Sequence, residues 1–453
     1  MNPSIFREYD IRGIVERDFP LELVVQLGRA IGSAVRQAEG KRIAVGHDCR
    51  LSSPTLVAAL HEGVRAAGVD VVDVGQVPTP VLYFAVQQLQ LDGGVQLTGS
   101  HNPPEYNGFK ILVGKSTIHG DAIQALRRRI ESQDFFEGSG SLERYDISTP
   151  YIDWIANNIK LQSRPLRVVV DGGNGVGGPI AVELYKRLGV EVEELFIEPD
   201  GRFPNHHPDP TVPENLEALI TEVRERHADF GISFDGDADR IGVVDEQGAI
   251  VWGDRLMILL SREVLREQPG AAIVGEVKCS QTLYDDITAH GGQAIMWKTG
   301  HSLIKAKMRE CNAALAGEMS GHIFFAHRYF GFDDAIYTGA RLLELMSRSK
   351  QSLSERLADV PVTHATPELR FDCPEQLKFQ VPKALAERFA KLGQVISVDG
   401  VRLRFEDSAW VLVRASNTQP VLVLRVEAPS HERMVELEAW LRAQVAEALQ
   451  ALS

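Results

Sequence analysis

An alternation of short apolar strands and amphipathic helices constrains the fold of this chain more than any other feature, because it recurs along the sequence. The copies span 41–74, 166–197 and 271–297. In the first copy the helical pattern begins at Ser52 or Ser53 and ends at Gly68, between two apolar runs. Strands that alternate with helices in this way predict three α/β domains of comparable size.

The pattern changes near residue 362. Beyond this point the apolar runs lie closer together, as at 410–413 and 421–426, and a helix is expected from about Ser430. These features predict a smaller α+β domain in the C-terminal part. A chain of 453 residues is long enough for several domains, each with its own core.

The composition excludes some classes of function. A formal net charge of −14 at pH 7, without a long Lys or Arg tract, disfavours a general role in binding nucleic acid. The apolar run 256–260 is too short to cross a bilayer, and the N-terminus lacks the pattern of a signal peptide. The scattered cysteines predict neither a zinc site nor a disulfide framework. We therefore expect a cytoplasmic protein with no membrane partner.

Ser100 stands in the sequence Leu-Thr-Gly-Ser-His-Asn-Pro-Pro (97–104), directly after an apolar stretch that predicts a buried strand. Gly99 removes bulk before the serine, and the Asn-Pro-Pro sequence forces a turn after it. A hydroxyl group held at a strand end can act as a nucleophile or carry a covalent group. An ordinary Ser/Asn/Pro turn explains the same residues and stays open at this point.

Three carboxylates, Asp235, Asp237 and Asp239, are separated only by Gly and Ala. Oxygen ligands at this spacing suit a hard cation. An EF-hand for calcium has the same spacing, but its sixth position requires Gly and is Arg240 here, and the flanking runs predict strands instead of helices. A magnesium ion shared with phosphate is the favoured interpretation. A solvated acidic turn is the alternative that needs no ion.

A glycine-rich run at 173–178 favours a different function. It matches G-x-G-x-x-G between a strand and a helix, as in dinucleotide-binding folds. However, Asp171 and Asn174 would crowd a pyrophosphate group, and Pro179 removes a donor from the helix N-terminus. An NAD-dependent oxidoreductase is therefore a distant alternative. Close packing of the strand against its return helix explains the glycines without a cofactor.

Five motifs, in order, resemble those of the α-D-phosphohexomutase family, and most closely its bacterial phosphomannomutase/phosphoglucomutase branch. These motifs lie at 6–13, 97–110, 233–240, 317–322 and 414–420. The resemblance covers nearly the whole chain. It implies an α/β fold with three related α/β domains of mixed sheet with helices on both faces, plus a smaller C-terminal α+β domain, around a central cleft.

The resemblance also guides the domain boundaries. The implied domains are a phosphoserine-bearing domain (1–146), a metal-binding domain (147–248), a sugar-recognition domain (249–361) and a phosphate-binding domain (362–453). The family's reaction is a reversible transfer of a phosphoryl group between the 1- and 6-positions of hexose phosphates, through a phosphoserine and a bound 1,6-bisphosphate. This implies Mg²⁺ as cofactor, glucose 1,6-bisphosphate or an equivalent as activator, and phosphosugar substrates.

The implied substrates are mannose phosphates, glucose phosphates or both. Met319 favours this branch over the phosphoglucosamine mutases, which remain an alternative. The branch also implies a monomer.

The resemblance assigns a role to each motif. Ser100 would carry the phosphoryl group and, with Asp235, Asp237 and Asp239, would hold the metal ion. The other catalytic candidates are Lys110 and His301 as acid and base, Arg12 and Arg240 as stabilising charges, and His101 as a ligand of the phosphoserine loop or a proton carrier. The substrate-binding candidates are Tyr9, Arg255, Lys278, Glu318, Ser320, His322, Arg414, Ser416, Asn417 and Thr418.

Two of these motifs have chemistry that fits their implied roles. Glu318 and Ser320 would bind the 3- and 4-hydroxyl groups of the sugar, and the loop at Arg414 groups donors that suit a phosphate that is not reacting. Ala238 stands where the family often has Gly. We expect its methyl group to be tolerated there if its φ is negative.

Overall fold

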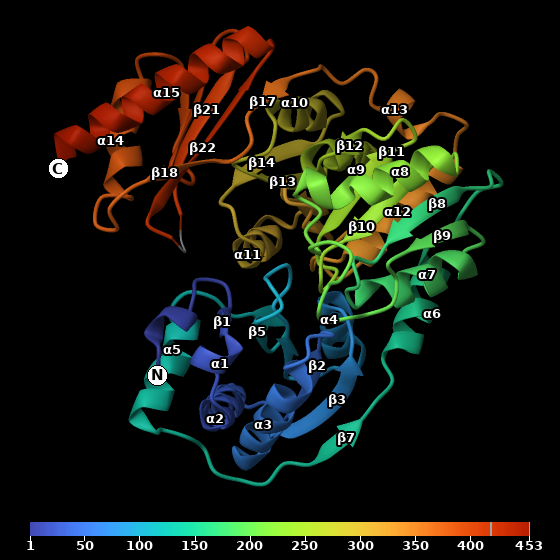
Figure 1. The fold of residues 1–453 in the computed structure, drawn as a ribbon, viewed down its shortest axis with the longest axis vertical. Helices are drawn as coiled ribbons and strands as arrows, with labels where there is room; N and C mark the ends of the chain where they lie inside the picture. Colours follow the sequence, from blue (N-terminus) through green and yellow to red (C-terminus); the bar gives the residue numbers. More distant parts are fainter. Residues whose placement is uncertain (417–418, 453) are drawn as a thin grey trace. The chain divides into compact units, whose positions relative to one another are not determined.

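The computed structural model describes residues 1–416 and 419–452 and divides into two compact units. The first unit comprises Met1–Glu263 and Ser320–Arg356, and the second comprises Val264–Met319 and Leu357–Ser453. The first boundary falls within helix α9 (Gly253–Glu267). Figure 1 labels the helices and strands of both units.

The first sheet of the first unit is mixed. Its strands lie in the order β1 (Ile11–Ile14), β5 (Tyr106–Val113), β4 (Gly93–Leu97), β2 (Arg42–His47), β3 (Asp70–Gln76) and β7 (Leu142–Arg144), with β6 (Ser116–Thr117) paired to β5. Strands β4, β2, β3 and β7 run parallel, whereas β5 is antiparallel to both of its neighbours β4 and β1. The predicted strand–helix–strand unit at 41–74 is confirmed as β2, α3 (Ser53–Ala66) and β3.

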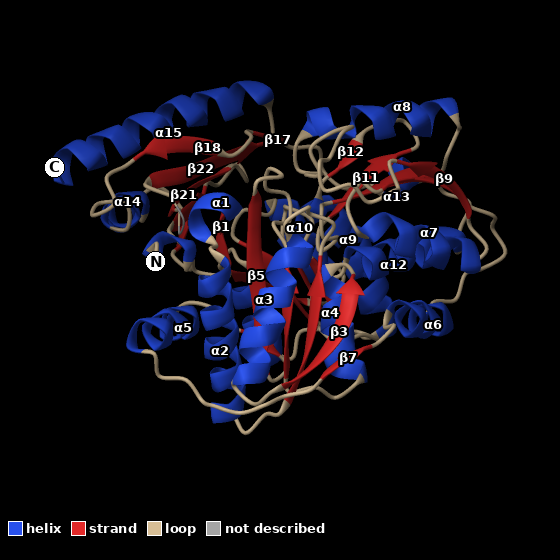
Figure 2. Ribbon diagram, turned by 60° about the horizontal axis from the view of Figure 1, so that its bottom comes forward, coloured by secondary structure: helices blue, strands red, loops and turns tan. Residues whose placement is uncertain are grey.

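Helices cover both faces of this sheet. Helices α2 (Leu21–Gln37), α3 and α5 (Asp121–Ser132) share one hydrophobic core with β2, β4 and β5. Figure 2 shows α2 and α3 side by side in front of the strands. On the other face, a side chain at Gly94 would meet Leu82 and Val86 of α4 (Thr79–Gln88). The short helix α1 (Val15–Asp18) follows β1.

The second sheet of the first unit is also mixed. Its order is β12 (Ile250–Val251), β11 (Ile241–Asp245), β10 (Phe230–Phe234), β8 (Arg167–Asp171) and β9 (Glu191–Leu195). Strands β10, β8 and β9 are parallel, and β11 is antiparallel to β10. Helix α8 (Glu217–Glu225) packs on one face, and α7 (Gly177–Arg187) and α12 (Ala335–Ser347) lie on the other. The unit also contains α6 (Ser148–Asn158), β16 (Ile323–Phe325) and α13 (Leu353–Arg356).

The second unit holds a parallel and an antiparallel arrangement of strands. Strand β13 (Ala272–Glu276) runs parallel to β14 (Gln293–Trp297) and β15 (Leu315–Gly317), with α10 (Gln281–Ala289) and α11 (His301–Cys311) in the connections. The antiparallel sheet contains β17 (His364–Ala365), β18 (Leu369–Asp372), β22 (Val421–Ala428), β21 (Trp410–Ala415), β20 (Val401–Arg404) and β19 (Gln394–Ile396). Its core is covered by α14 (Gln380–Phe389) and α15 (His431–Leu452).

These sheets confirm the predicted fold class of α/β domains with mixed sheets and a C-terminal α+β part. The boundaries at 146, 248 and 361 and the central cleft stay predictions. Within residues 1–416 and 419–452, none of the helices combines the length and apolar character that crossing a bilayer requires. Each of the four cysteines lies in the described part and none forms a disulfide there, as the sequence predicted.

One buried carboxylate, Asp334, fixes the loop before α12. It caps the helix by accepting a hydrogen bond from Tyr337 N at 2.8 Å. It also accepts hydrogen bonds from the hydroxyl groups of Tyr151 on α6 at 2.9 Å and of Tyr329 at 2.6 Å. These bonds tie α6, α12 and the loop between β16 and α12 together. The loop includes Asp333, which belongs to the site described below.

Replacement of this carboxylate should destabilise the protein. We predict that Asp334→Ala lowers the free energy of unfolding by about 3 kcal/mol, because three buried donors lose their acceptor. Denaturant unfolding measures the effect. The matched control is Asp153→Ala on α6, whose carboxylate pairs with Arg187 while both side chains are about half exposed, so it should change stability by less than about 0.5 kcal/mol. Equal stability of the two variants would contradict the assignment.

Candidate active site

Ser100 lies just beyond the C-terminal end of β4, in a segment we call the serine loop (residues 98–106). Its side chain is buried, and its φ of 49° lies in the left-handed region. Ser100 Oγ donates to Asp235 Oδ2 at 2.8 Å and lies 3.1 Å from His101 Nδ1. The serine loop therefore directs its hydroxyl group at the first of the predicted metal ligands.

The three aspartates lie in the turn between β10 and β11, which we call the metal loop (residues 235–240). The flanking elements are strands, as predicted, and this excludes the two helices of an EF-hand. Asp235, Asp237 and Asp239 are fully buried, and one carboxylate oxygen from each lies within 4.8 Å of the others. Asp235 Oδ1 accepts hydrogen bonds from the N–H groups of Asp239 and Arg240, both at 3.1 Å. These bonds fold the loop around its first carboxylate.

The condition set for Ala238 in this loop, a negative φ, is not met. Its φ is +54°, so the alanine occupies the left-handed region. Ala238 N donates to Asp235 O at 3.0 Å, and its carbonyl group accepts from Ala335 N at 3.2 Å. The loop's own hydrogen bonds therefore hold a conformation that favours glycine.

Lys110 on β5 brings a positive charge to the aspartates. Its Nζ donates to Asp237 Oδ2 at 2.6 Å and also to Asp239 Oδ2. Burial opposes the charge of Lys110, but Asp237 and Asp239 outweigh this effect and raise its pKa. Burial, followed by the negative charges of Asp237 and Asp239, raises the pKa of Asp235 well above its ordinary value. The charged form of Asp235 is therefore disfavoured beside its two neighbours.

The donor set fits a divalent cation. Asp237 Oδ1 and Asp239 Oδ1 are buried and have no hydrogen-bond partner within the described part of the chain. Buried carboxylate oxygens without donors are costly unless a cation takes them. Three carboxylates against one ammonium group also leave an excess of negative charge that a divalent ion would balance. Oxygen ligands of this kind are those that Mg²⁺ prefers.

Arginine and histidine side chains surround the two loops. Arg12 on β1 donates to the side chains of Asn102 in the serine loop and of Asp10. Arg240 Nε donates to His322 Nε2 at 2.9 Å. Burial, and then the positive charges of Arg240 and Arg12, lower the pKa of His101 well below its ordinary value. The structure thus brings Arg12, Arg240 and His101 to Ser100 and the metal loop.

His322, a predicted substrate-binding residue, lies beside the metal loop. Its Nδ1 lies 3.1 Å from Asp333 Oδ2 and 3.6 Å from Asp239 Oδ1. With Arg240 hydrogen-bonded to Nε2, the imidazole bridges three charged groups at the metal loop.

Three further candidates lie in the first unit. Tyr9 lies between the first turn and β1, Arg255 lies on α9, and Ser320 begins the segment Ser320–Arg356 of this unit.

In the second unit, the carboxylates of Glu276 and Asp399 contact the segments that carry four predicted residues. These residues are Lys278, His301, Glu318 and Arg414. Glu276 at the end of β13 accepts from Met319 N at 3.0 Å and from Thr299 Oγ1 at 2.6 Å, and it lies 3.6 Å from Lys278 Nζ. Glu318 accepts from Gly300 N at 2.6 Å, directly before His301 at the start of α11. These contacts gather Lys278, His301 and Glu318 near one end of β13.

Asp399 is the second organising carboxylate. Asp399 Oδ2 accepts from Arg414 Nε at 3.0 Å and from Thr299 N at 3.1 Å.

Lys278 Nζ also donates to Glu368 at 2.6 Å. Burial opposes the charge of Lys278, yet Glu276 and Glu368 raise its pKa. Ser416 N donates to Val421 O at 3.0 Å at the end of β21. The predicted residues Asn417 and Thr418 lie outside the described residues.

Several residues of the site were not predicted from the sequence. Thr79, at the start of α4, donates through its hydroxyl group to Asp237 Oδ2. Asp333 contacts His322, and Glu276 and Asp399 organise the second unit. The one local signal is the Asp333-Asp334 pair before a helical pattern, because an aspartate at such a position often caps the helix.

The glycine run at 173–178 supports the metal loop. A Cβ atom at Gly175 would lie 2.7 Å from Gly236 O, and Val176 N donates to the same oxygen at 3.2 Å. A Cβ atom at Gly177 would lie 2.4 Å from the methyl group of Ala238. We expected these glycines to serve strand–helix packing, but two of them make room for the metal loop. The dinucleotide interpretation is not needed.

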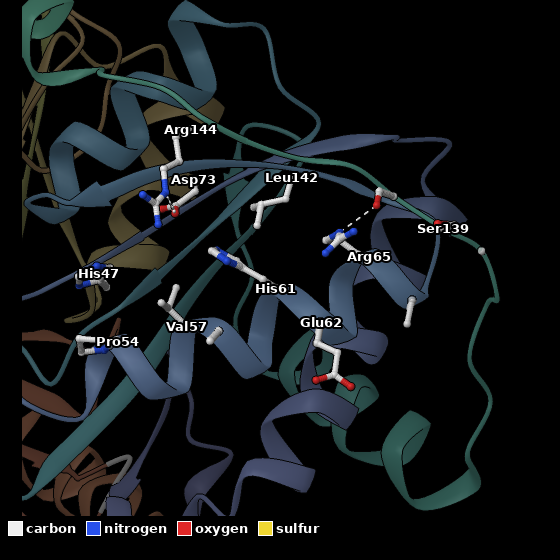
Figure 3. Close-up of a pocket in the computed structure, with 14 residues that line it drawn as sticks. His47, Pro54, Val57, His61, Glu62, Arg65, Asp73, Ser139, Leu142 and Arg144 are labelled. Carbon is white, nitrogen blue, oxygen red and sulfur yellow. Dashed lines mark hydrogen bonds and ion pairs between the residues drawn. The ribbon is translucent and has the colours of Figure 1, made fainter.

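A cavity of about 730 Å³ in the first unit is separate from these residues. Figure 3 shows His61 in its wall beside Asp73 and Arg144. Arg144 lies 3.6 Å from Asp73, and Arg65 donates to Gly140 O at 2.9 Å. The cavity contains none of the predicted catalytic or substrate-binding residues, and its charged groups are of both signs.

Comparison with known proteins supports one family over the whole chain. Four domain descriptions match consecutive regions: phosphoglucomutase/phosphomannomutase alpha/beta/alpha domain I (3–137), domain II (149–248), domain III (252–363) and the C-terminal domain (368–444). The phosphomannomutase/phosphoglucomutase of Pseudomonas aeruginosa is 49% identical over 98% of this chain and 95% of that protein. A phosphoglucomutase of Neisseria gonorrhoeae is 46% identical over 96% of this chain and 95% of its own.

A solved structure supports the same conclusion. The crystal structure of a phosphoglucomutase/phosphomannomutase family protein from Burkholderia thailandensis is 47% identical to this chain, with a TM-score of 0.94. The similarity covers 99% of this chain and 98% of that one. This chain belongs to the phosphoglucomutase/phosphomannomutase family.

Proposed function

We propose that this protein is a phosphohexomutase that transfers a phosphoryl group between the 1- and 6-positions of mannose or glucose phosphates through a phosphoserine at Ser100. The observation that carries the proposal is the 2.8 Å hydrogen bond from Ser100 Oγ to Asp235, within the buried cluster of three aspartates and Lys110. Membership of the family supports the reaction. The names of the relatives favour mannose and glucose phosphates over glucosamine phosphate.

The reaction conserves atoms through two opposite transfers. In the first, the phosphorus of phosphoserine bonds to the free hydroxyl oxygen of a sugar monophosphate while its bond to Ser100 Oγ breaks. The sugar hydroxyl releases a proton, and Ser100 Oγ gains one. In the second, the other phosphoryl group of the 1,6-bisphosphate leaves the sugar oxygen and bonds to Ser100 Oγ, with both proton transfers reversed. The net product is the isomeric sugar monophosphate.

The residues around Ser100 and the metal loop have different proposed roles in this transfer. Lys110 holds a proton on Nζ beside Asp237 and Asp239. The acid–base role we propose for it is to exchange this proton during transfer. Neutral His101 can hydrogen-bond Ser100 Oγ through Nδ1 at 3.1 Å. Arg12 and Arg240 supply fixed positive charge for the transferring group. His301 stays a candidate for the second acid–base group.

A magnesium ion fits the metal loop. Asp235, Asp237 and Asp239, with an oxygen of the phosphorylated Ser100, would hold it. When bound, the ion would act as a Lewis acid that stabilises negative charge on the transferring phosphoryl group. Asp333 and Arg240 hold His322 beside Asp239, and these contacts support the metal loop.

The remaining candidates are proposed to recognise the substrate. We assign the 3- and 4-hydroxyl groups to Glu318 and Ser320, and the non-reacting phosphate to Arg414, Ser416, Asn417 and Thr418. Tyr9, Arg255, Lys278 and His322 complete the proposed set. Glucose 1,6-bisphosphate as activator, a monomeric state and a cytoplasmic location stay predictions of the same proposal.

Ser100→Ala should remove both phosphorylation and turnover. We expect the wild-type protein to gain one phosphoryl group from glucose 1,6-bisphosphate by intact mass, and the variant to gain none because it lacks the accepting oxygen. Turnover of glucose 1-phosphate should fall by at least about 1,000-fold. Ser132→Ala, at an exposed serine on α5, is the control and should behave as wild type. Phosphorylation of the Ser100→Ala variant would contradict the assignment.

Magnesium should stabilise the unphosphorylated protein through the metal loop. At 100 times its dissociation constant, Mg²⁺ should add about 2.7 kcal/mol and raise the midpoint of thermal unfolding. Asp239→Asn should abolish most of this shift, because it removes a charged ligand. The matched control is Asp245→Asn, a buried aspartate on β11 that accepts from Gln247 N and Ala249 N. It should lower stability but keep the shift. An equal shift in Asp239→Asn and wild type would refute the metal site.

A further inference from the structure

Arg50 is a buried arginine between β2 and α3, and its guanidinium group faces the backbone of the serine loop. All five of its N–H groups have acceptors, which is the full capacity of an arginine. Four of the acceptors are backbone carbonyl oxygens: Ser100 at 2.8 Å, Asn102 at 2.6 Å, Pro103 at 2.5 Å and Tyr106 at 3.0 Å. One side chain therefore holds four points of a seven-residue backbone segment.

The fifth acceptor is Asp48, which fixes the guanidinium group in turn. Asp48 Oδ2 accepts from Arg50 Nε and from Gly99 N, both at 3.1 Å. Asp48 Oδ1 accepts from Arg50 N at 3.0 Å and from Ser53 Oγ at 2.7 Å. The carboxylate joins the arginine, the start of α3 and the residue before the serine. We call Asp48 and Arg50 the loop clamp.

The loop clamp also explains the glycine before the serine. A Cβ atom at Gly99 would lie 2.3 Å from Arg50 Cζ. The guanidinium group therefore occupies the place where a side chain at this position would be. Only glycine lets the backbone approach the arginine this closely.

Ser100 needs such support because its backbone is strained. A φ of 49° at a residue other than glycine costs about 1 kcal/mol and persists only where the surroundings enforce it. Arg50 donates hydrogen bonds to the carbonyl oxygens of Ser100 and Asn102, which lie on either side of His101 in the chain. These bonds hold the backbone of Ser100 in the left-handed conformation. The same conformation places Ser100 Oγ 2.8 Å from Asp235 Oδ2.

We propose that the loop clamp of Asp48 and Arg50 positions Ser100 Oγ for phosphoryl transfer. This inference rests on the proposed function. Arg50 is a positioning residue, since its contacts with the serine loop are to carbonyl oxygens and not to the reacting hydroxyl group. A nucleophile displaced by about 1 Å loses about 100-fold in rate. Loss of the clamp should therefore slow the chemical step and leave sugar binding nearly unchanged.

The test is Arg50→Lys, which keeps the charge but replaces the planar five-donor group with a three-donor ammonium. The phosphorylated protein is mixed with glucose 1-phosphate in a single turnover, and conversion of the sugar into its 1,6-bisphosphate and 6-phosphate is followed by rapid quench. We expect the rate constant to fall about 100-fold, while the half-saturating glucose 1-phosphate concentration changes less than about threefold. A single-turnover rate constant is independent of the fraction of protein that is active, so partial misfolding does not reproduce this result.

Arg164→Lys is the matched control. Its guanidinium group donates to the carbonyl oxygens of Met346, Ser349 and Gln351 and to Asp229, and none of these is a proposed site residue. It should lower the midpoint of unfolding and keep the wild-type rate constant. If Arg50→Lys does not fold, Asp48→Asn weakens the same clamp and takes its place in the assay.

The outcomes separate this inference from the proposed function. If wild type does not transfer its phosphoryl group to the sugar, the proposed function fails and the clamp has no reaction to serve. If wild type transfers it and the folded Arg50→Lys or Asp48→Asn variant transfers it at the same rate, the inference is overturned. The inference is supported if the clamp variant has a lower rate constant and an unchanged half-saturating concentration of glucose 1-phosphate, while Arg164→Lys keeps the wild-type rate constant.

Discussion

The burial of three aspartates beside a single lysine is the constraint on which the first unit depends. Asp235, Asp237 and Asp239 have no exposed surface, and Lys110 balances only part of their charge. Uncompensated carboxylates at such depth are costly, and the raised pKa of Asp235 expresses that cost. The cluster therefore suits a divalent cation, as the proposed function requires. The excess negative charge of the buried aspartates accounts both for the cost of burying the cluster and for its proposed role in binding a cation.

The fold places this cluster where two sheets end. Ser100 follows the C-terminal end of β4, and Asp235 follows that of β10, each strand lying in a parallel part of its sheet. Carboxyl ends of parallel strands are the usual place for ligand sites in α/β folds. Behind each loop lies a dedicated support. The loop clamp holds the serine loop, and the 173–178 glycine run holds the metal loop.

The sequence predicted the elements and the chemical groups better than their supports. Ser100, Lys110 and the aspartates were recognised because their types, spacing and family order mark them before any contact is known. Thr79 and Arg50 were missed because their significance lies in contacts with residues 158 and 50 positions away. The left-handed conformation of Ala238 was also beyond reach, because it depends on hydrogen bonds to Asp235 and from Ala335. The glycine run was expected to allow close packing, but its packing against Gly236 of the metal loop could not be predicted from the sequence.

The central claim is that this protein moves a phosphoryl group within a hexose phosphate. The most direct measurement is ³¹P NMR of the purified protein with Mg²⁺, a trace of glucose 1,6-bisphosphate and the 1-phosphate of glucose, mannose or glucosamine in separate tubes. The account predicts that the 1-phosphate resonance of glucose or mannose is replaced by that of the 6-phosphate, with no release of inorganic phosphate. Unchanged spectra for both sugars, from folded protein that carries phosphoserine, would contradict it.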